Sequence, residues 1–380
     1  MDFDKELDRR QSHSVKWDYY KGTEVEPFWV ADMDFAAPDA VVDALHERID
    51  HPVFGYTLPP DELNEVVIKR LAEQYNWQIK KEWLVWLPGI VSALEISCRA
   101  YGGEGGDVMT LTPIYPPFMT APKHSGQKAI AVPFSEDNGR WFIDFTILEN
   151  AITDKTQLLL LCNPHNPVGR VFRRDELEQL AALAEKYDLT ICSDEIHCEL
   201  ILEKDLEHIP IATMSKAIEQ RTVTLMAPSK TFNIAGLSCA FAVIPDRKRK
   251  LAFQRSKEGI VSPVNALGFT AALAAYRDAE EWHIHLLNYL RNNRDILEEM
   301  LNDIPGLSVS HVEATYLAWI DCRDLPVKNP THFFEKVNVG LSCGIHFGLA
   351  GYVRFNFACP RSRMTAALER MIEAVQNIEV

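Results

Sequence analysis

Short apolar runs alternate with longer amphipathic stretches through the middle of the chain. The apolar runs predict buried β-strands at 85–87, 107–111, 157–162, 189–193, 222–226 and 240–244. The stretches between them have apolar residues at helical spacing, as at 91–101, 173–187 and 263–277. Continuous apolar strands separated by helices are typical of a largely parallel sheet that helices cover on both faces. The pattern therefore predicts an α/β fold.

The pattern changes after about residue 280. A long helical stretch at 280–302 leads into Pro305-Gly306, and short strand candidates follow at 307–312, 315–321 and 352–358, before a last amphipathic helix from Arg363. This order predicts a smaller α+β unit, and we expect the N-terminal segment, with a helix at 39–50, to pack against it. The predicted domains are 45–278 for the large unit, and 1–44 with 279–380 for the small one.

Length and charge narrow the range of functions. A chain of 380 residues is too long for one ordinary compact core, which favours two domains or one large α/β unit. The formal net charge is −15, from 39 basic and 54 acidic residues. A negative field of this size repels nucleic acid and anionic lipid. The start of the chain is charged, and no apolar run has membrane-spanning length, so we expect neither a signal peptide nor a membrane partner.

The cysteines and acidic pairs give no sign of a disulfide framework or a metal site. The eight cysteines are scattered without a C-x-x-C spacing, which indicates reduced thiols in a cytoplasmic protein. The pair Asp32 and Asp34 is too unspecific a spacing to predict a metal site, so we expect no metal. The glycines at 102–106 do not form a G-x-G-x-x-G fingerprint, which argues against a nicotinamide enzyme.

Polar residues follow three successive strand candidates. Strand 157–162 runs into N-P-H-N-P-V-G at 163–169, strand 189–193 into Asp194, and strand 222–226 into Ser229-Lys230. Each has an ordinary structural explanation alone, as a turn, a helix cap or a solvated loop. Because ligands of open parallel sheets bind beyond the carboxyl ends of the strands, their common placement predicts one site.

The same strings resemble a known family. N-P-H-N-P-V-G, then S-D-E-I-H, then S-K-T-F-N-I-A-G-L are similar to fold-type I pyridoxal phosphate enzymes of the class I/II aminotransferase superfamily, over nearly the whole chain. W-V-A-D-M-D-F at 29–35, with C-N-P-H-N-P-V-G-R and S-K-T-F-N-I-A-G-L, resembles the cystathionine β-lyase and cysteine C–S lyase branch. The resemblance implies an aminotransferase-like large domain, a smaller α+β domain and pyridoxal 5′-phosphate as cofactor.

The resemblance also implies roles for residues around the cofactor ring. Lys230 would bind the cofactor covalently and later act as a general base. Asp194 would pair with the protonated pyridine nitrogen, and Asn166 would donate to the phenolic oxygen. His197 stands where transaminating relatives commonly have a tyrosine for that same oxygen, and it is nearly as well explained as a core histidine. Tyr115 would stack on the pyridine face, with a core aromatic as the alternative.

The phosphate and the substrate carboxylate need donors and positive charge. The amides of Ile90 and Val91 at a predicted helix start, with the Ser229 hydroxyl, are the expected phosphate donors. Ser238 and Ala227 stand where many relatives have an arginine and a serine, so the phosphate must draw on other groups as well. Arg354, inside an apolar strand, is the candidate for the substrate α-carboxylate.

Tyr56 matches a tyrosine that reaches the phosphate or substrate of the neighbouring subunit. The resemblance therefore implies a homodimer with shared sites.

The residues are compatible with more than one reaction. The first hypothesis is β-elimination at the C–S bond of L-cystathionine or another cysteine S-conjugate, giving a thiol, pyruvate and ammonia. The alternative is an aminotransferase acting on an amino acid and a 2-oxo acid, since the same side chains serve both. A binding or regulatory protein that retains the fold is a third hypothesis. A Ser229-Lys230 hydrolase dyad would leave the surrounding motif unexplained.

Overall fold

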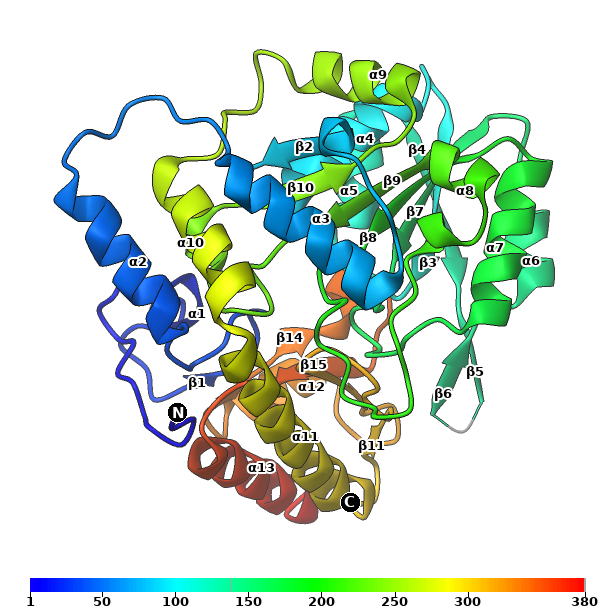
Figure 1. Cartoon of the computed structure of the whole chain (residues 1–380). Coiled ribbons are helices and arrows are strands. Elements are labelled where there is room, and N and C mark those ends of the chain that lie inside the picture. The colour runs from blue at the N-terminus through cyan, green and yellow to red at the C-terminus, as the bar shows by residue number, and fades with distance from the viewer. Residues whose placement is uncertain (138, 379–380) are drawn as a thin grey trace.

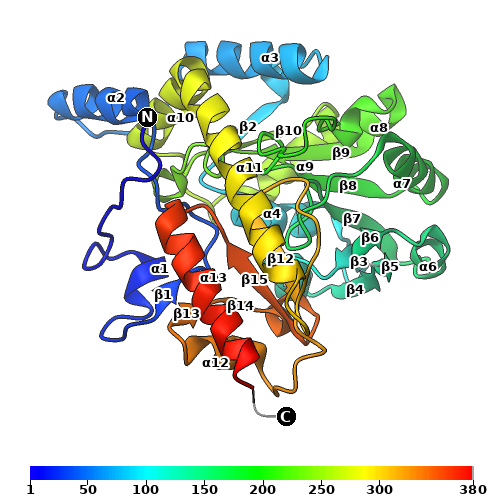
Figure 2. The ribbon, with the colours of Figure 1, turned by 90° about the horizontal axis from the view of Figure 1, so that it is seen from below.

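A computed structural model gives the structure of the chain and describes residues 1–137 and 139–378 (Figures 1 and 2). The first half of the chain contributes seven α-helices, which are α1 (Val15–Asp18), α2 (Asp39–Asp50), α3 (Asp61–Tyr75), α4 (Ile90–Tyr101), α5 (Pro117–His124), α6 (Phe145–Asn150) and α7 (Arg174–Lys186). The second half contributes α8 (Lys216–Arg221), α9 (Arg247–Lys257), α10 (Ala266–Asp278), α11 (Glu280–Asn302), α12 (Pro330–Glu335) and α13 (Arg361–Gln376).

A seven-stranded sheet forms the centre of the larger unit. Its order is β2-β10-β9-β8-β7-β3-β4, with β2 (Leu84–Leu87), β3 (Asp107–Thr112), β4 (Lys128–Pro133), β7 (Thr156–Cys162), β8 (Thr190–Asp194), β9 (Thr222–Met226) and β10 (Ala240–Val243). Strand β10 is antiparallel to both of its neighbours, and the pairings from β9 to β4 are parallel. The predicted α/β fold with a mostly parallel sheet is confirmed.

Both faces of this sheet are apolar because helices cover both. Along β7, Leu158 and Leu160 pack on the face of α4, α5 and α9, while Leu159 and Leu161 pack on the face of α7 and α8. All four side chains are buried. A strand buried on both faces reads as a continuous apolar run, which is why the pattern predicted these strands well.

The smaller unit is built on a four-stranded antiparallel sheet, in the order β11-β12-β15-β14. Its strands are β11 (Ser308–Val309), β12 (Leu317–Asp321), β14 (Ser342–Cys343) and β15 (Tyr352–Asn356). The long α11 lies beside α13, as Figure 2 shows (yellow and red). Two further pairs are β1 (Glu26–Pro27) with β13 (Val339–Gly340), and β5 (Ser135–Asp137) with β6 (Arg140–Phe142).

The N-terminal segment joins the two units. Its strand β1 pairs with β13, and the Phe28 ring stacks on Phe355 of β15, with centroids 4.6 Å apart. We expected helix 39–50 beside the smaller unit, but α2 packs on α10. The N-terminal segment therefore divides near residue 38, and the predicted domain boundaries stay a prediction.

None of the helices in the described residues combines the length and the apolar character needed to cross a bilayer.

Candidate active site

Five strands that run in the same direction end at one edge of the large sheet, and the predicted polar residues follow them there. In the register, Cys162 at the end of β7 lies opposite Asp194 of β8, and Asp194 lies opposite Leu225 of β9. The loop after β9 brings Lys230 to the same edge, and the loop after β3 brings Tyr115. The predicted convergence of strand ends is confirmed.

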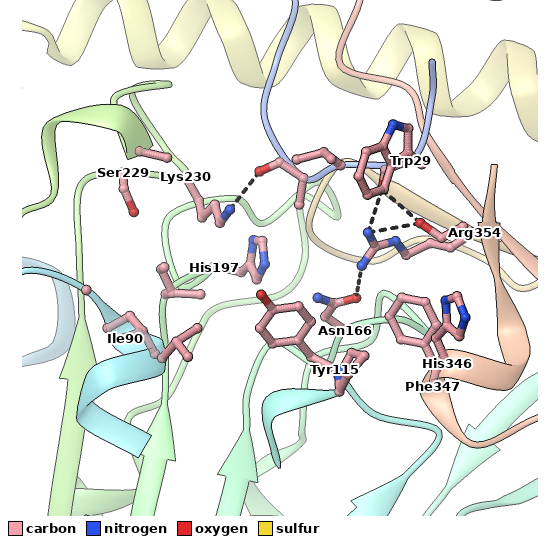
Figure 3. A pocket seen from close by; sticks show the side chains of 18 of the residues that line it. Trp29, Ile90, Tyr115, Asn166, His197, Ser229, Lys230, His346, Phe347 and Arg354 are labelled. Atoms are coloured by element: carbon pink, nitrogen blue, oxygen red, sulfur yellow. Dashed lines mark hydrogen bonds between the residues drawn. The ribbon is translucent and has the colours of Figure 1, made fainter. Parts of the chain in front are cut away.

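A cavity of about 810 Å³ opens at this edge and reaches the smaller unit (Figure 3). Nine of the ten predicted site residues line it, namely Ile90, Val91, Tyr115, Asn166, Asp194, His197, Ser229, Lys230 and Arg354. Figure 3 shows Ser229 and Ile90 on one side and Arg354 with Phe347 on the other, with His197 between them. The tenth residue, Tyr56, does not line the cavity of its own chain and is fully exposed.

Lys230 is held as a partly desolvated amine. Its Nζ donates to the carbonyl oxygen of Ala31 at 2.7 Å. Burial lowers its pKa to about 8, with the nearby Arg354 guanidinium acting in the same direction against Asp32 and Asp194. A lowered pKa increases the fraction of neutral amine near neutral pH, which is the form that attacks a carbonyl or accepts a proton.

Asp194 is a buried carboxylate that forms no ion pair with the residues the structure describes. Its Oδ1 accepts a hydrogen bond from the Ile196 amide at 3.1 Å. Burial raises its pKa to about 7, only partly offset by this bond and by Lys230. Leaving a carboxylate buried and unpaired is costly, so the site fits a ligand that presents a cationic ring nitrogen to it.

His197 is neutral, because burial, together with Lys230 and Arg354, lowers its pKa to about 3. Its ring Nδ1 is buried without a hydrogen-bond partner in the described residues. The ring lies edge-on to Tyr316, with centroids 6.1 Å apart. Its place in the cavity wall suits contact with a ligand, while the Tyr316 packing also suits a core role, so both interpretations of His197 stay open.

Arg354, on β15, is fixed by three oxygen atoms at the side of the cavity. Its guanidinium donates to Asn166 Oδ1 at 2.9 Å, to the Trp29 carbonyl at 2.7 Å and to Ser342 Oγ at 3.4 Å. It lies over the Phe347 ring, 4.7 Å from the centroid. Burial lowers its pKa to about 10, so it stays a cation at neutral pH. These three partners are neutral, so none of them is a carboxylate that would pair with the positive charge. The guanidinium is therefore available to bind the carboxylate of a ligand.

The bond to Arg354 also orients Asn166. Since the amide oxygen accepts from the guanidinium, the amide nitrogen is the end of Asn166 that is left to donate to a ligand.

The start of α4 provides backbone donors. Gly89 is the N-cap residue and has no side chain to cap the first amides of the helix. The residues that carry these amides, Ile90, Val91 and Ser92, line the cavity together with Ser229 and Ser238. A helix N-terminus with adjacent hydroxyls fits a phosphate group. Ser92 and Ser238 line the cavity and are available as the further phosphate donors that the missing arginine led us to expect.

The residues present therefore fit pyridoxal 5′-phosphate. Lys230 suits its aldehyde, Asp194 its ring nitrogen and the start of α4 its phosphate. Tyr115 lines the cavity and is available to stack on the ring. No cluster of histidine, cysteine and acidic side chains within the described residues has the arrangement of a metal site.

Sequence reasoning missed the groups that hold the N-terminal segment against Lys230. Asn233 accepts from the Met33 amide at 3.0 Å and donates to the carbonyls of Met33 and Phe35. These bonds set the position of the Ala31 carbonyl. Asn233 belongs to the string S-K-T-F-N-I-A-G-L and W-V-A-D-M-D-F spans Ala31, so the two quoted strings are bound to each other.

The fold and the cavity are those expected of a pyridoxal phosphate enzyme with an aminotransferase-like fold. Residues 24–371 match the family described as aminotransferase class I and II, and the chain belongs to this family.

Individual members of this family are similar to the chain along its whole length. Cystathionine beta-lyase PatB of Bacillus subtilis is 35% identical to this chain, over 99% of the chain and 100% of PatB. The crystal structure of OvoB has a TM-score of 0.97 and 44% identity, with 100% of both chains covered. The structure of cystalysin from Treponema denticola, described as containing a pyridoxal 5′-phosphate cofactor, has a TM-score of 0.96 and 32% identity, with 100% of this chain and 99% of cystalysin covered.

Proposed function

We propose that this protein is a pyridoxal phosphate-dependent carbon–sulfur lyase that carries out β-elimination on L-cystathionine or related cysteine S-conjugates. The observation that carries the proposal is one cavity holding a desolvated amine, Lys230, an unpaired buried carboxylate, Asp194, and an unpaired buried guanidinium, Arg354. The similarity to a cystathionine beta-lyase along the whole chain supports the reaction type.

Each of these residues has a task in the elimination. When bound, pyridoxal phosphate supplies an electron-withdrawing ring that stabilises negative charge at the substrate Cα. Asp194 keeps the facing ring nitrogen protonated, and Arg354 binds the α-carboxylate through its planar guanidinium. Lys230 accepts the Cα proton, after which the Cβ–S bond breaks and the electron pair leaves with the sulfur. Water then completes the conversion of the remaining three-carbon unit to pyruvate and ammonia.

The first experiment measures pyruvate from L-cystathionine and the purified holoenzyme, with no 2-oxo acid added. Release of pyruvate and homocysteine in equal amounts supports elimination. Turnover that needs a 2-oxo acid and gives a new amino acid would instead establish the aminotransferase alternative. Absence of both, in a protein whose visible spectrum shows bound cofactor, would make a binding or regulatory role the better hypothesis.

We also propose a homodimer with shared sites. An extended segment before α3 carries apolar side chains that are largely exposed in one chain, namely Val53, Phe54, Tyr56 and Leu58. Apolar side chains gathered in one exposed segment mark interaction surfaces, and a second copy would cover this one. Tyr56 then serves the cavity of the neighbouring subunit.

Subunit mixing tests the shared site. Tyr56→Ala and Lys230→Ala are each expected to be inactive, while a mixture refolded together regains roughly a quarter of the wild-type activity, because half of the dimers have one complete site. Light scattering gives the oligomeric state of each sample. No recovery in a mixed dimer would contradict the sharing of sites.

A cytoplasmic location is the last part of the proposal. All eight cysteines are free, and seven of them are buried, which is typical of proteins in a reducing compartment. The net charge of −15 disfavours nucleic acid and anionic membranes as partners, and we propose a small amino-acid substrate instead.

A further inference from the structure

One short stretch of the N-terminal segment, residues 29–33, is held by side chains along its whole length. Each of its five consecutive carbonyl oxygens accepts a hydrogen bond from a side chain of the larger or the smaller unit. The donors are Lys230 and Asn233 from the larger unit, and Tyr316, Ser342, Arg354 and Asn356 from the smaller one. The stretch lies outside the helices and strands and has no ladder of its own, so these side chains fix its position.

Both cations of the active site are bound to this stretch. Lys230 Nζ donates to the Ala31 carbonyl at 2.7 Å, and Arg354 donates to the Trp29 carbonyl at 2.7 Å (Figure 3). Two residues of chain span at most about 7 Å, so the two carbonyl groups are close together on one backbone. Residues 29–31 therefore connect the Lys230 amine to the Arg354 guanidinium over a short, fixed stretch of chain.

The Ala31 carbonyl accepts two hydrogen bonds, and only one of them comes from Lys230. The other comes from the Tyr316 hydroxyl, at 2.9 Å. Tyr316 is fully buried and does not line the cavity. Burial, with the nearby Asp32 carboxylate, raises the pKa of Tyr316 above its usual value, so the hydroxyl keeps its proton. A carbonyl oxygen has two lone pairs, and here Tyr316 occupies one and leaves the other to the amine.

The shared carbonyl gives the Lys230 amine a direction. A neutral amine has one lone pair, so an N–H bond held on the Ala31 carbonyl restricts where that lone pair points. In the proposed function this lone pair accepts the Cα proton of the substrate, and proton transfer requires it to be aimed at that proton. The position left for the amine on the carbonyl depends on the position that the Tyr316 hydroxyl occupies.

We propose that Tyr316 is a positioning residue for Lys230 and acts through the Ala31 carbonyl that both side chains share. The inference rests on the proposed function, because it concerns the aim of the amine that accepts the Cα proton. Tyr316 touches neither substrate nor cofactor in this role. The Trp29 carbonyl has its own donors, Ser342 and Arg354, so the carboxylate-binding group does not depend on the Tyr316 hydroxyl.

Steady-state kinetics of the Tyr316→Phe holoenzyme tests the position of the amine. The variant keeps the buried ring and loses only the hydroxyl. We expect kcat for pyruvate release from L-cystathionine to fall about tenfold, with KM within about twofold of the wild type, because Arg354 keeps its bonds. An unchanged kcat, or a change mainly in KM, would overturn the proposal.

Tyr101→Phe is the matched control. Tyr101 is also buried, its hydroxyl also donates to a backbone carbonyl, that of Arg249 at 2.8 Å, and it does not line the cavity. The control therefore loses the same kind of hydrogen bond at a distance from Lys230, and its kcat is expected to stay at the wild-type value. An equal loss of kcat in both variants would show a general effect on the fold and would overturn the positioning role.

The reactivity of Lys230 gives a readout that does not depend on turnover. Acetic anhydride modifies neutral amines, so mass spectrometry of Lys230 modification in the apoprotein at different pH values gives the pKa of this amine. The charged groups that act on Lys230, namely Asp32, Asp194 and Arg354, are the same in Tyr316→Phe. Without the competing hydroxyl, the Ala31 carbonyl accepts from the ammonium alone, so the midpoint is expected to rise by about half a pH unit.

The two measurements separate this inference from the proposed function. If the wild-type holoenzyme releases no pyruvate but the midpoint rises in Tyr316→Phe and not in Tyr101→Phe, the elimination is rejected and the positioning of Lys230 is supported. If pyruvate is released and the Lys230 midpoint is the same in the wild type and in Tyr316→Phe, the elimination stands and the positioning role of Tyr316 is overturned.

Discussion

Asp34 and Asp194 are both buried carboxylates, 1% and 5% exposed, but their surroundings differ. Asp34 accepts from Arg9, Lys16, Trp17 and Arg363 at 2.7 to 2.9 Å. Although burial alone raises its pKa, Lys16 and Arg363 hold the pKa of Asp34 well below its usual range. Asp194 accepts from one backbone amide, and burial raises its pKa to about 7.

This difference distinguishes a carboxylate that stabilises the fold, Asp34, from one that is available to a ligand, Asp194. The partners of Asp34 all lie in this chain, so its ionisation is already compensated in the folded protein and supports folding. Asp194 has no ion-pair partner among the described residues, and Lys230 offsets the cost of its burial only in part. Burial also lowers the pKa values of Lys230 and Arg354, so it disfavours the charged form of all three groups. Perturbed groups that gather in a cavity are the physical mark of a functional site.

Lys230→Ala should have the largest effect on activity. Pyruvate release from L-cystathionine should fall by a factor of at least about 10⁴, because the general base and the covalent anchor are lost together. The apoprotein should keep its free energy of unfolding, since the lost amine was desolvated. Urea unfolding and the pyruvate assay measure the two effects. Lys257→Ala, a half-buried lysine outside the cavity, is the control and should retain activity.

Asp34→Asn, unlike Lys230→Ala, should affect stability. It should reduce the free energy of unfolding by about 3–5 kcal/mol at pH 7, because buried cations lose their partner. In the wild type, the contribution of Asp34 is present above the unfolded pKa, near 4, and is lost as the pH falls towards the lower folded pKa. Urea unfolding at pH 7 tests this. Asp61→Asn, in an exposed pair with Lys81, should leave the midpoint unchanged. An equally small change in both variants would remove the distinction between Asp34 and Asp194.

Asp194→Asn should stabilise the apoprotein at neutral pH. Because the folded pKa of about 7 lies above the unfolded value, the folded wild type keeps a proton that the unfolded chain has lost, and its stability falls as the pH rises between the two values. The variant lacks this slope, so its advantage should grow by up to about 3 kcal/mol between pH 5 and pH 7. Urea unfolding of both apoproteins at the two pH values measures it. A constant difference would contradict the raised pKa of Asp194.

Arg354→Lys should have the smallest of these effects. The ammonium keeps the charge but not the planar pair of donors, so kcat/KM for L-cystathionine should fall about thirtyfold, about 2 kcal/mol, mostly through KM. Steady-state kinetics separates KM from kcat. Arg173→Lys, whose partner Glu313 lies away from the cavity, is the matched control. A loss confined to kcat would contradict the carboxylate-binding role of Arg354.

The inner strands of the larger unit were readily predictable from the sequence, while its edge strand β4 and its helix α3 were not predicted. Strands such as β7 and β8 are buried on both faces, so each appears as an apolar run whose bounds nearly match the structure. The shorter strands β13 and β14 and the helix α12 were missed, because two to six residues hold too little periodicity to be recognised.

Some residues of the site could likewise be predicted from the sequence, and others could not. Residues at strand ends, such as Asp194 and Lys230, could be predicted from their order along the chain and from the resemblance. Glu335 and Tyr20, which also line the cavity, could not, because they meet through a contact between segments 315 residues apart that no local pattern records. The Ala31 contact of Lys230 is equally hidden, since it uses a backbone carbonyl that any residue type could provide.

The bond between Arg354 and the Trp29 carbonyl spans 325 residues of the chain. During synthesis, Trp29 therefore leaves the ribosome 325 residues before its partner Arg354. The sheet with Lys230 and Asp194 can form earlier, because its strands lie between residues 84 and 243. A nascent chain consequently passes through a period in which the edge with Lys230 and Asp194 exists but Arg354, which we propose to bind the substrate carboxylate, does not. The proposed ability to select an amino acid therefore comes after the proposed cofactor-binding edge.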